Sequence, residues 1–436
     1  MTASPYRHVY AELAKVEKSY QEVNISTTSV DTNLLAANYR YVAYPVETSG
    51  GGLFAVLPAN GYGKVGTTNS VFRGHTGGVL DVDFNPFNDN IIASAAEDAT
   101  LRVWQIKFNG TDVEEQNESL AVMKGHSRRV QRLTWNPAVN NCIATFGAEK
   151  SVKVWDVSKA SCVYTFKAGK YDLLDLNWNQ NGNLLVYPMK DKKLHVLDIR
   201  ANAETFAVNS HPGLRGGRAV FYDKLNMVAT TGFSSSSGRR IAICDIRNPE
   251  NPLAQIDVDS NNGILAPFID EDTGVLACFS RGDALIRFYE LQSAENPLVT
   301  CNAFACKEAV RAFARAPKYC VDTNVCEIDR FYIINQAKQL QTTQVIVPRK
   351  NAEIFQEDIY SETNAPVPGI EFDAWKAGGE PKFQKISLEN GYTPADGAAF
   401  SVEAQAEETV ESLKEENEKL RTRIAQLEEE LRQLKH

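Results

Sequence analysis

The chain has 436 residues, which is long for an average single domain but suits one large all-β domain with appendages. Apolar residues make up 43% of the sequence, and no apolar run approaches the ~20 residues that a membrane helix needs, which argues against a transmembrane protein. The formal net charge of −9 argues against general nucleic-acid binding, and eight scattered cysteines without a CxxC pair argue against structural zinc or a disulfide framework.

The N-terminal stretch MTASPYRHVYAELAK lacks the apolar core of a secretory signal. We therefore expect a cytoplasmic protein whose cysteines are buried free thiols. Two or three strands are predicted in LLAANYRYVAYPVETSGGGLFAVLP, residues 34–58, around a turn at Gly50-Gly51-Gly52. This turn lacks the following helix that a phosphate-binding loop requires.

A repeat runs through the centre of the chain. IIASAAEDATLRVWQI, from Ile91, aligns without gaps with CIATFGAEKSVKVWDV, from Cys142. Each copy is preceded by a Gly-His pair and by an alternating strand that ends in Asn-Pro. Repeats of roughly 40–45 residues with this pattern are typical of WD-repeat propeller blades.

Fainter copies continue at compatible spacing, with Leu197-Asp198, Cys244-Asp245 and Tyr289-Glu290 in the Trp-Asp position. Five blades are visible as repeats, and the length from about residue 25 to 347 leaves room for two more. We therefore predict an all-β fold, a seven-bladed WD-repeat β-propeller over residues 1–346 that includes the N-terminal segment.

The polar residues inside the repeat are predicted to be structural rather than catalytic. A WD blade links its loop, turn and inner strands through a hydrogen-bond relay, because each buried polar group must find a partner. The repeated placement of the histidines explains them without catalysis. The predicted relay residues are His75, Ser94, Asp98 and Trp104 in the first clear repeat and His126, Thr145 and Trp155 in the second, where Glu149 takes the acidic position.

Residues 347–391, called the strap below, are too apolar to remain in solvent. Pro348, Pro366 and Pro368 break regular structure in this stretch, so we expect it to lie as an irregular segment on one face of the propeller. Residues 392–408 are rich in Ala, Gly and Ser and are predicted to be a flexible linker. The apolar residues of the strap include Ile354, Phe355, Ile359, Tyr360, Ile370, Phe372 and Trp375.

Residues 409–436 carry a heptad seam that predicts an α-helical coiled coil. A single helix would expose this apolar stripe to water, so we expect the chain to associate with copies of itself. The g-to-e pairs Glu416/Arg421, Arg423/Glu428 and Glu430/Lys435 are all opposite in sign, which favours a parallel arrangement. The seam consists of Val410, Leu413, Asn417, Leu420, Ile424, Leu427, Leu431 and Leu434.

The seam residues leave two oligomeric states open. Leu at d with β-branched residues and Asn417 at a favours a homodimer. The stretch Arg423-Ile424-Ala425-Gln426-Leu427-Glu428 resembles a signature associated with three-stranded parallel coils, and we favour a parallel homotrimer.

Taken together, these motifs resemble those of the coronins, the actin-associated WD-repeat family, over nearly the whole length of the chain. The resemblance lies in YRHVY at Tyr6, SGGGLFAVLP at Ser49 and GHTGGVLDVDFNPFND at Gly74. It continues in KDKK at Lys190, GFSSSSGRR at Gly232 and CEIDRFY at Cys326. It ends with VPRKNAEIFQEDIY at Val347, a linker and a short coil, a combination far more specific than the WD pattern alone.

The resemblance implies a homo-oligomer that binds and organises actin filaments at the cell cortex. It also implies influence on the branched-actin nucleating complex and on severing by cofilin-type proteins, with roles in motility and phagocytosis. Relatives commonly carry an Arg implicated in filament contact after an early Tyr; aligned through Tyr20, this chain has Asn24 there. Contact is then either shifted to other basic residues or weaker for each propeller, which makes oligomerisation more important.

Because actin filaments are acidic, the contact surface is expected to carry clustered Lys and Arg on loops at a propeller face. A basic side chain on a loop can equally be a scattered, solvated charge. The candidates are Arg7, Arg128, Arg129, Lys190, Lys192, Lys193, Arg215, Arg218, Arg239 and Arg240.

Two other function classes compete with this interpretation. An enzyme is disfavoured because the sequence has no Walker or dinucleotide loop, no HExxH, no GxSxG and no metal-ligand cluster, so no cofactor or metal is predicted. A generic WD-repeat scaffold for multiprotein assembly would share the fold and the coil. It would not co-sediment with pure actin filaments at low salt.

Overall fold

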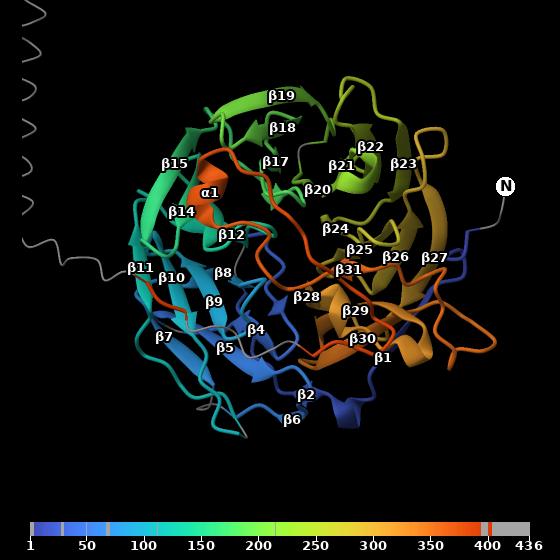
Figure 1. Cartoon of the computed structure of the whole chain (residues 1–436), viewed down its shortest axis with the longest axis horizontal. Coiled ribbons are helices and arrows are strands. Elements are labelled where there is room, and N and C mark those ends of the chain that lie inside the picture. The colour runs from blue at the N-terminus through green and yellow to red at the C-terminus, as the bar shows by residue number, and fades with distance from the viewer. Residues whose placement is uncertain are drawn as a thin grey trace, which may run out of the picture.

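Seven antiparallel blades surround a central axis in the computed structural model, which describes residues 4–27, 30–48, 50–66, 70–110, 112–213, 215–393 and 400–402 (Figure 1). This confirms the predicted all-β, seven-bladed propeller. In blades 2 to 6 four consecutive strands run from the axis to the rim, and blade 1 follows the same order with β6 left out.

The first four blades cover the region where the repeat is clearest. Their strands are β3 (Ala36–Ala37), β4 (Tyr41–Pro45), β5 (Gly52–Pro58) and β7 (Val71–His75); β8 (Val79–Phe84), β9 (Ile91–Ala96), β10 (Thr100–Gln105) and β11 (Ala121–Lys124); β12 (Val130–Trp135), β13 (Cys142–Gly147), β14 (Ser151–Asp156) and β15 (Ser161–Lys167); β16 (Asn177–Trp178), β17 (Leu184–Pro188), β18 (Lys193–Asp198) and β19 (Ala203–Asn209).

The last three blades and the short elements complete the described structure. They are β20 (Arg218–Tyr222), β21 (Met227–Phe233), β22 (Arg239–Asp245) and β23 (Ala254–Asp259); β24 (Leu265–Ile269), β25 (Val275–Ser280), β26 (Leu285–Glu290) and β27 (Val299–Ala305); β28 (Val310–Arg315), β29 (Glu327–Asn335) and β30 (Leu340–Ile346); the 3-10 helices η1 (Val16–Lys18), η2 (Asp223–Leu225), η3 (Lys318–Cys320) and η4 (Thr323–Val325); and β1 (Tyr10–Leu13), β2 (Tyr20–Gln21), β6 (Gly63–Lys64), β31 (Thr363–Asn364), α1 (Phe372–Lys376) and β32 (Lys385–Ile386).

Burial follows the position of a strand within its blade. The second strands β9 and β13 are buried at every residue, because neighbouring blades cover both of their faces. The rim strands β15 and β19 are mostly exposed or half-buried and are rich in polar residues. The core is therefore a series of apolar layers between adjacent blades.

An N-terminal strand closes the ring. β1 pairs with β30 in the register Tyr10↔Ile346 to Leu13↔Thr343, so the first strand of the chain supplies the rim strand of blade 7. β2 and β6 extend the same sheet. Such a shared blade replaces an open sheet edge with paired strands and ties the two ends of the propeller together.

The hydrogen-bond relay joins blades 1 and 2. His75 lies on β7, with its Nδ1 2.9 Å from Asp98 Oδ2 and its Nε2 2.8 Å from Ser94 Oγ. The indole Nε1 of Trp104 donates to the same Ser94 oxygen at 2.8 Å. Burial alone would raise the pKa of Asp98, but hydrogen bonds from His75 and Thr100 hold that pKa well below its ordinary value.

The second relay repeats this geometry one blade further. His126 Nε2 lies 2.7 Å from Thr145 Oγ1, which also accepts from Trp155 Nε1 at 2.8 Å. Glu149 bonds to His126 Nδ1 in the place of the aspartate. One buried hydroxyl therefore satisfies two ring nitrogens in each of these blades.

Replacing Ser94 by Ala should lower the free energy of unfolding by about 2–3 kcal/mol, because two buried ring nitrogens lose their partner at once. Guanidinium denaturation and the thermal midpoint provide the measurement. S127A is the matched control, since Ser127 is exposed beside the second histidine and its loss should be close to neutral. Equal stability of S94A and S127A would contradict this account.

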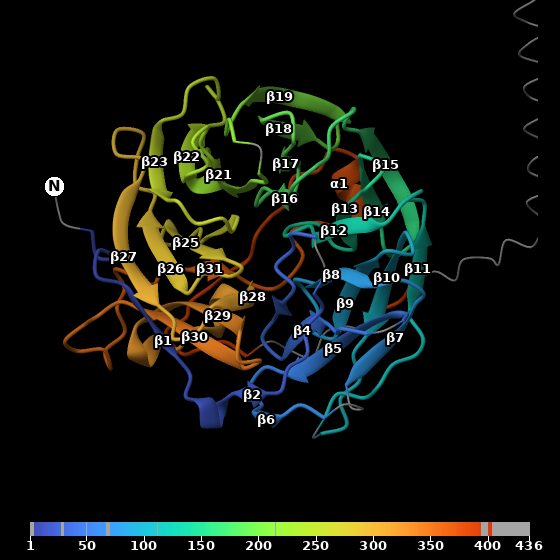
Figure 2. The same ribbon diagram turned by 180° about the vertical axis from the view of Figure 1, so that it is seen from behind.

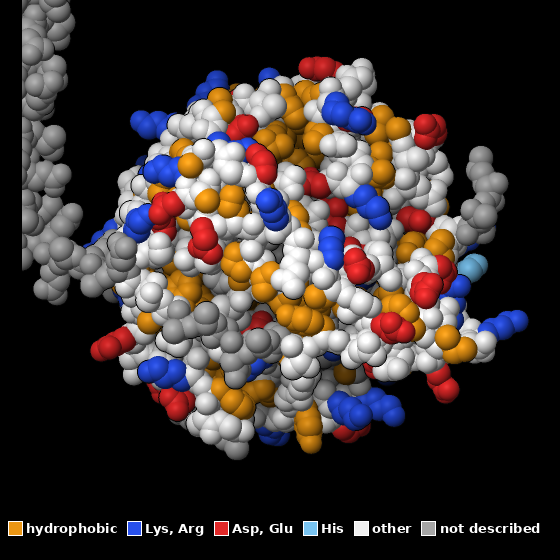
Figure 3. All heavy atoms as spheres, in the orientation of Figure 1, with side chains coloured by type: hydrophobic (Ala, Val, Ile, Leu, Met, Phe, Trp, Pro, Cys, Tyr) orange, Lys and Arg blue, Asp and Glu red, His pale blue; other side chains and the backbone are white. Residues whose placement is uncertain are grey.

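The strap crosses the face at which the last strand of blade 7 ends (Figure 1). Ile359 and Tyr360 are buried with Val347 in the core cluster of blades 6 and 7. Further along, Phe372 and Trp375 of α1 are buried against blades 3 and 4. Figure 3 shows this face, on which basic and acidic side chains are interspersed around apolar patches.

Beyond the strap, the described residues of the predicted linker are 392–393 and 400–402. Phe400 and Val402 pack against the apolar cluster shared by blades 2 and 3, so the linker contacts the propeller again before it ends. The predicted coiled coil, with all of its seam residues, lies outside the described residues.

Candidate functional site

The two faces of the propeller differ, and β12 shows how. Arg128 and Arg129 precede this strand, whereas Ala138 and Val139 follow it and bond to the strap: Gly369 N donates to Ala138 O at 2.9 Å. The strap and the Arg128-Arg129 pair therefore lie at opposite ends of the same strand. Figure 2 views the propeller from the face opposite the strap.

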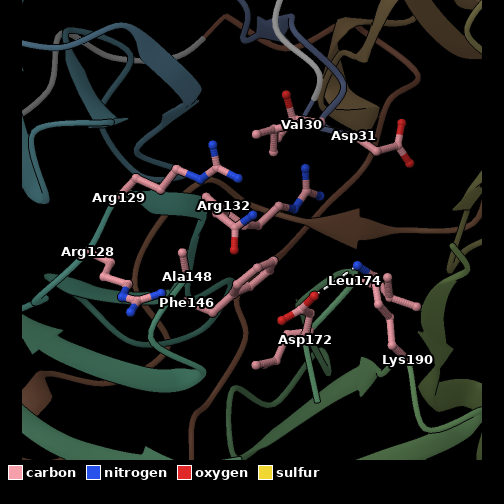
Figure 4. A pocket seen from close by; sticks show the side chains of 13 residues that line it. Val30, Asp31, Arg128, Arg129, Arg132, Phe146, Ala148, Asp172, Leu174 and Lys190 are labelled. Carbon is pink, nitrogen blue, oxygen red and sulfur yellow. Dashed lines mark hydrogen bonds and ion pairs between the residues drawn. The ribbon is translucent and has the colours of Figure 1, made fainter. Parts of the chain in front are cut away.

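A cavity of about 430 Å³ opens at this second face beside the central axis (Figure 4). Blades 3 and 4 supply its basic side chains, and residues 30–32 form the opposite wall. The lining residues are Val30, Asp31, Thr32, Arg128, Arg129, Gln131, Arg132, Phe146, Ala148, Asp172, Leu173, Leu174 and Lys190.

The segment at residues 30–33 is fixed by arginines from distant blades. Arg218 Nη2 donates to the backbone oxygen of Asp31 at 3.0 Å, and Arg281 Nη1 donates to that of Val30 at 3.0 Å. Thr32 Oγ1 donates to Leu80 O at 3.0 Å. This wall of the cavity is therefore held by blades 2, 5 and 6.

Among the described residues, two of the basic side chains that line the cavity form ion pairs, and two do not. Arg132 is 3.1 Å from Asp175 and 3.8 Å from Asp81, so its guanidinium is committed to neighbouring carboxylates. Lys190 donates to Asp172 at 2.8 Å, and this contact lowers the pKa of Asp172. In the described part of the chain, the exposed Arg128 and Arg129 form no ion pair.

A second, shallow hollow of about 20 Å³ adjoins the cavity and shares Leu174 and Lys190 with it. Its rim includes Lys192, Lys193 and Arg215. The guanidinium of Arg215 lies 5.5 Å above the ring of Phe233, which fixes the position of its charge. We define the basic surface as Arg128, Arg129, Lys190, Lys192, Lys193 and Arg215.

Two predicted contact residues do not belong to this surface, because they are buried. Arg218 is 3% exposed and bonds to residues 31 and 33. Arg239 is fully buried, and its guanidinium pairs with Asp259 and with Asp283 at 2.8 Å. The prediction that these two arginines present their charge to a partner is wrong, because both are buried and paired with carboxylates as structural ion pairs.

Two other predicted residues line neither the cavity nor the hollow. Arg240 is paired with Asp257 at 2.7 Å along the rim of blade 5. Arg7 is exposed next to Tyr6, which packs with Ile359 and Tyr360 of the strap, so Arg7 lies at the strap face. These placements leave six of the ten candidates together.

Asn24, at the position where relatives commonly carry an Arg, has a structural partner. Its side-chain oxygen accepts from Lys338 Nζ at 2.8 Å. Lys338 lies in the turn between β29 and β30. Asn24 is therefore an uncharged residue bonded to blade 7, and it supplies no positive charge for filament contact.

A third relay histidine, His211, was not predicted from the sequence. His211 Nε2 lies 3.0 Å from Thr230 Oγ1, and the two residues are 19 positions apart, the spacing of His75 to Ser94 and His126 to Thr145. That spacing was the available signal. It was obscured because the acidic and Trp positions hold Ser234 and Arg240 instead.

The altered relay changes the chemistry of His211. Burial first, and then the charge of Arg240, lower its pKa to about 4. His211 is therefore neutral at physiological pH. Its Nδ1 has no hydrogen-bond partner among the described residues.

No group of three or more His, Cys, Asp or Glu side chains in the described ranges is placed to hold a metal ion. None of the helices described is long and apolar enough to span a membrane.

Three family models match parts of the chain. Residues 1–64 match a domain of unknown function, DUF1899. Residues 66–105 and 117–156 match the WD domain, G-beta repeat, and residues 340–382 match a further type of WD40 repeat.

Two curated relatives are similar over most of this chain. A coronin-like protein of Saccharomyces cerevisiae is 33% identical, with 99% of this chain and 68% of the relative covered. A coronin-like protein of Schizosaccharomyces pombe is also 33% identical, with 86% of this chain and 62% of the relative covered. The chain thus spans about two thirds of the length of these relatives.

A solved structure shows the same fold. The WD40 domain of Toxoplasma gondii coronin superposes with a TM-score of 0.83 at 30% sequence identity, covering 88% of this chain and 97% of that domain. A chain of the mitotic checkpoint complex matches at a TM-score of 0.57 and 15% identity, which reflects the propeller fold alone.

Proposed function

This chain belongs to the coronin family, and on that premise we propose that it binds the sides of actin filaments through the basic surface, as a homo-oligomer of propellers. The observation that carries the proposal is the position of Arg128 and Arg129. Both are exposed and free of ion pairs among the described residues, and they stand on the face that the strap leaves open.

The charge pattern supports contact with an acidic polymer. The chain is acidic overall, yet six basic side chains gather beside the axis from the loops of blades 3, 4 and 5. A local positive patch steers an acidic partner to one orientation, even on a protein of net negative charge. On the strap face, by contrast, basic and acidic side chains are interspersed (Figure 3).

Oligomerisation explains how a modest contact becomes effective. A rim charge contributes little by itself, about 1 kcal/mol or less. When a coiled coil at residues 409–436 joins two or three propellers, later contacts on the same filament become intramolecular. We favour a parallel homotrimer over a homodimer, and propose that the heads bind along one filament or bundle two.

By the same family relationship, we propose that the protein acts in the cytoplasm, on the actin cytoskeleton at the cell cortex. Modulation of the branched-actin nucleating complex and of turnover by cofilin-type proteins, with roles in motility and phagocytosis, belongs to this proposal. Catalysis has no part in it.

The proposal is tested by pelleting the full-length protein with actin filaments. R128A/R129A should weaken binding about 10-fold to 30-fold, because two exposed charges contribute about 1 kcal/mol each. R7A/K350A is the matched control, since it removes two exposed charges at the strap face and should bind as the parent does.

Each result has a distinct meaning. Equal weakening of filament binding in both variants would show that binding depends on the overall charge of the protein and not on the basic surface. Failure of the parent protein to pellet with pure filaments at low salt would favour a WD-repeat scaffold without direct actin binding.

A further inference from the structure

We propose that the cavity lined by Arg128, Arg129 and Lys190 is a binding site for a small molecule that carries several phosphate groups, such as a polyphosphate chain or a polyphosphorylated ring (Figure 4). The site exists in each propeller and needs no second copy of the chain. Its ligand is either a soluble polyphosphate or the headgroup of a phosphorylated lipid, which share this chemistry.

The size of the cavity fits such a ligand. Its volume of about 430 Å³ falls within the roughly 300–1,000 Å³ of ordinary small-molecule sites. The neighbouring hollow of about 20 Å³ has room for little more than one water molecule. A ligand with several phosphates therefore belongs in the larger cavity.

The charges converge from different parts of the chain. Arg128 and Arg129 come from the loop before β12, Arg132 from β12 itself, and Lys190 from the loop after β17. Figure 4 shows these side chains around one space, with Asp31 across from them. Arg132 and Lys190 are already engaged by carboxylates, so a phosphorylated ligand would meet Arg128 and Arg129 first.

The two carboxylates in the wall do not cancel this field. Asp172 is already engaged by Lys190 at 2.8 Å and by Lys150 at 3.5 Å. Asp31 lies 3.4 Å from Arg218, a buried guanidinium behind the wall. The cations left for a ligand are Arg128 and Arg129, whose planar guanidinium groups match phosphate oxygens in a bidentate manner.

The site has a regulatory consequence that rests on the proposed function. Arg128, Arg129 and Lys190 also belong to the basic surface that we propose for actin. A bound polyphosphate would neutralise these charges and occupy the same face. Ligand and filament therefore compete.

The experiment is calorimetric titration of the full-length protein at low salt with sodium tripolyphosphate and with inositol hexakisphosphate. In parallel, flotation uses phosphatidylcholine vesicles with and without a bisphosphorylated inositol lipid. We expect one soluble ligand per chain, or vesicle binding that requires the phosphorylated lipid. R128A/R129A should weaken binding about 30-fold or more, because charge-assisted contacts are lost in pairs.

Two further variants separate the site from general charge. R7A/K350A should bind within about twofold of the parent, because both residues lie at the strap face. R128K/R129K keeps both charges but loses the bidentate geometry, and should weaken phosphate binding several-fold. Stronger binding to vesicles than to the soluble probes identifies a lipid headgroup, and the reverse identifies a soluble ligand.

Absence of binding to every probe would overturn the inference, as would equal weakening by R128A/R129A and R7A/K350A. Loss of filament binding in R128A/R129A without any phosphate binding by the parent would leave the proposed function standing and remove only this site. Phosphate binding by a parent protein that does not bind filaments would leave this site standing and remove the proposed function.

Discussion

Truncation after Val402 should yield a monomeric propeller that binds actin filaments about 100-fold or more weakly than the full-length protein. The deleted residues, 403–436, carry the heptad seam. Without that seam each head dissociates independently, and the avidity of about 10²–10⁴ that linked sites provide is lost. Filament pelleting and light scattering of both proteins provide the measurements.

The truncated protein should remain folded, because the residues that close the ring and anchor the linker are retained. β1 still pairs with β30, and Phe400 and Val402 still pack on blades 2 and 3. An unchanged thermal midpoint is the control. Fusion of the truncated chain to an unrelated parallel trimeric coil should restore binding.

Two outcomes would contradict this model. One is filament affinity of the monomer equal to that of the full-length protein. The other is a single-chain mass for the full-length protein at micromolar concentration. In either case avidity would not be the source of filament binding.

Replacing Trp375 by Ala should lower the free energy of unfolding by about 3–5 kcal/mol. The side chain is fully buried, and its Nε1 donates to Asn183 Oδ1 at 2.7 Å. Its ring lies edge-on to Tyr164, with centroids 6.2 Å apart. The substitution therefore creates a cavity between the strap and blades 3 and 4, and leaves the Asn183 oxygen without this donor.

Thermal and guanidinium midpoints provide the measurement, and limited proteolysis reports whether the strap detaches before the propeller unfolds. I354A is the matched control, because Ile354 belongs to the same strap but is 64% exposed. Filament binding by folded W375A should be unchanged, since the basic surface lies at the other face. A W375A midpoint equal to that of I354A would show that the strap contributes nothing to stability.

The candidate site shows where sequence patterns cease to be informative. Arg128 and Arg215 were recognisable as loop cations, and the structure places both on the basic surface. Arg239 has the same sequence character, but the carboxylates of Asp259 and Asp283 enclose it. Whether a loop arginine is free depends on the charges that neighbouring blades bring to it, which a local pattern does not contain.

His211 illustrates the opposite case, a signal that was present but incomplete. Its spacing of 19 residues to Thr230 equals that of the other two relays. Other residues replace its acidic and aromatic partners, so the repeat pattern was not recognised in the sequence. The hydrogen bond between His211 and Thr230 nevertheless forms. The histidine–hydroxyl contact can therefore persist when the acidic and Trp residues, which make the repeat recognisable in sequence, are absent.

By itself, the sequence determined the kind of blade and showed five of the copies, while the two remaining blades were inferred from the length of the chain. Alternating strands, turns and the recurring His, Ser or Thr, and Trp positions are local features, because side-chain alternation and turn chemistry act over a few residues. It also determined that residues 347–391 are too apolar to remain in water.

Only the tertiary structure decided how the ring closes and which face remains open. Tyr10 pairs with Ile346, which lies at the opposite end of the propeller sequence. No local sequence pattern predicts a pairing between residues so far apart in the chain. The strap binds at one end of β12 and the arginine pair stands at the other, so the polarity of one strand separates the two surfaces. Strand pairing between distant segments and the burial of charged side chains both depend on how all seven blades are placed relative to one another. They are therefore decided only when the whole chain is folded.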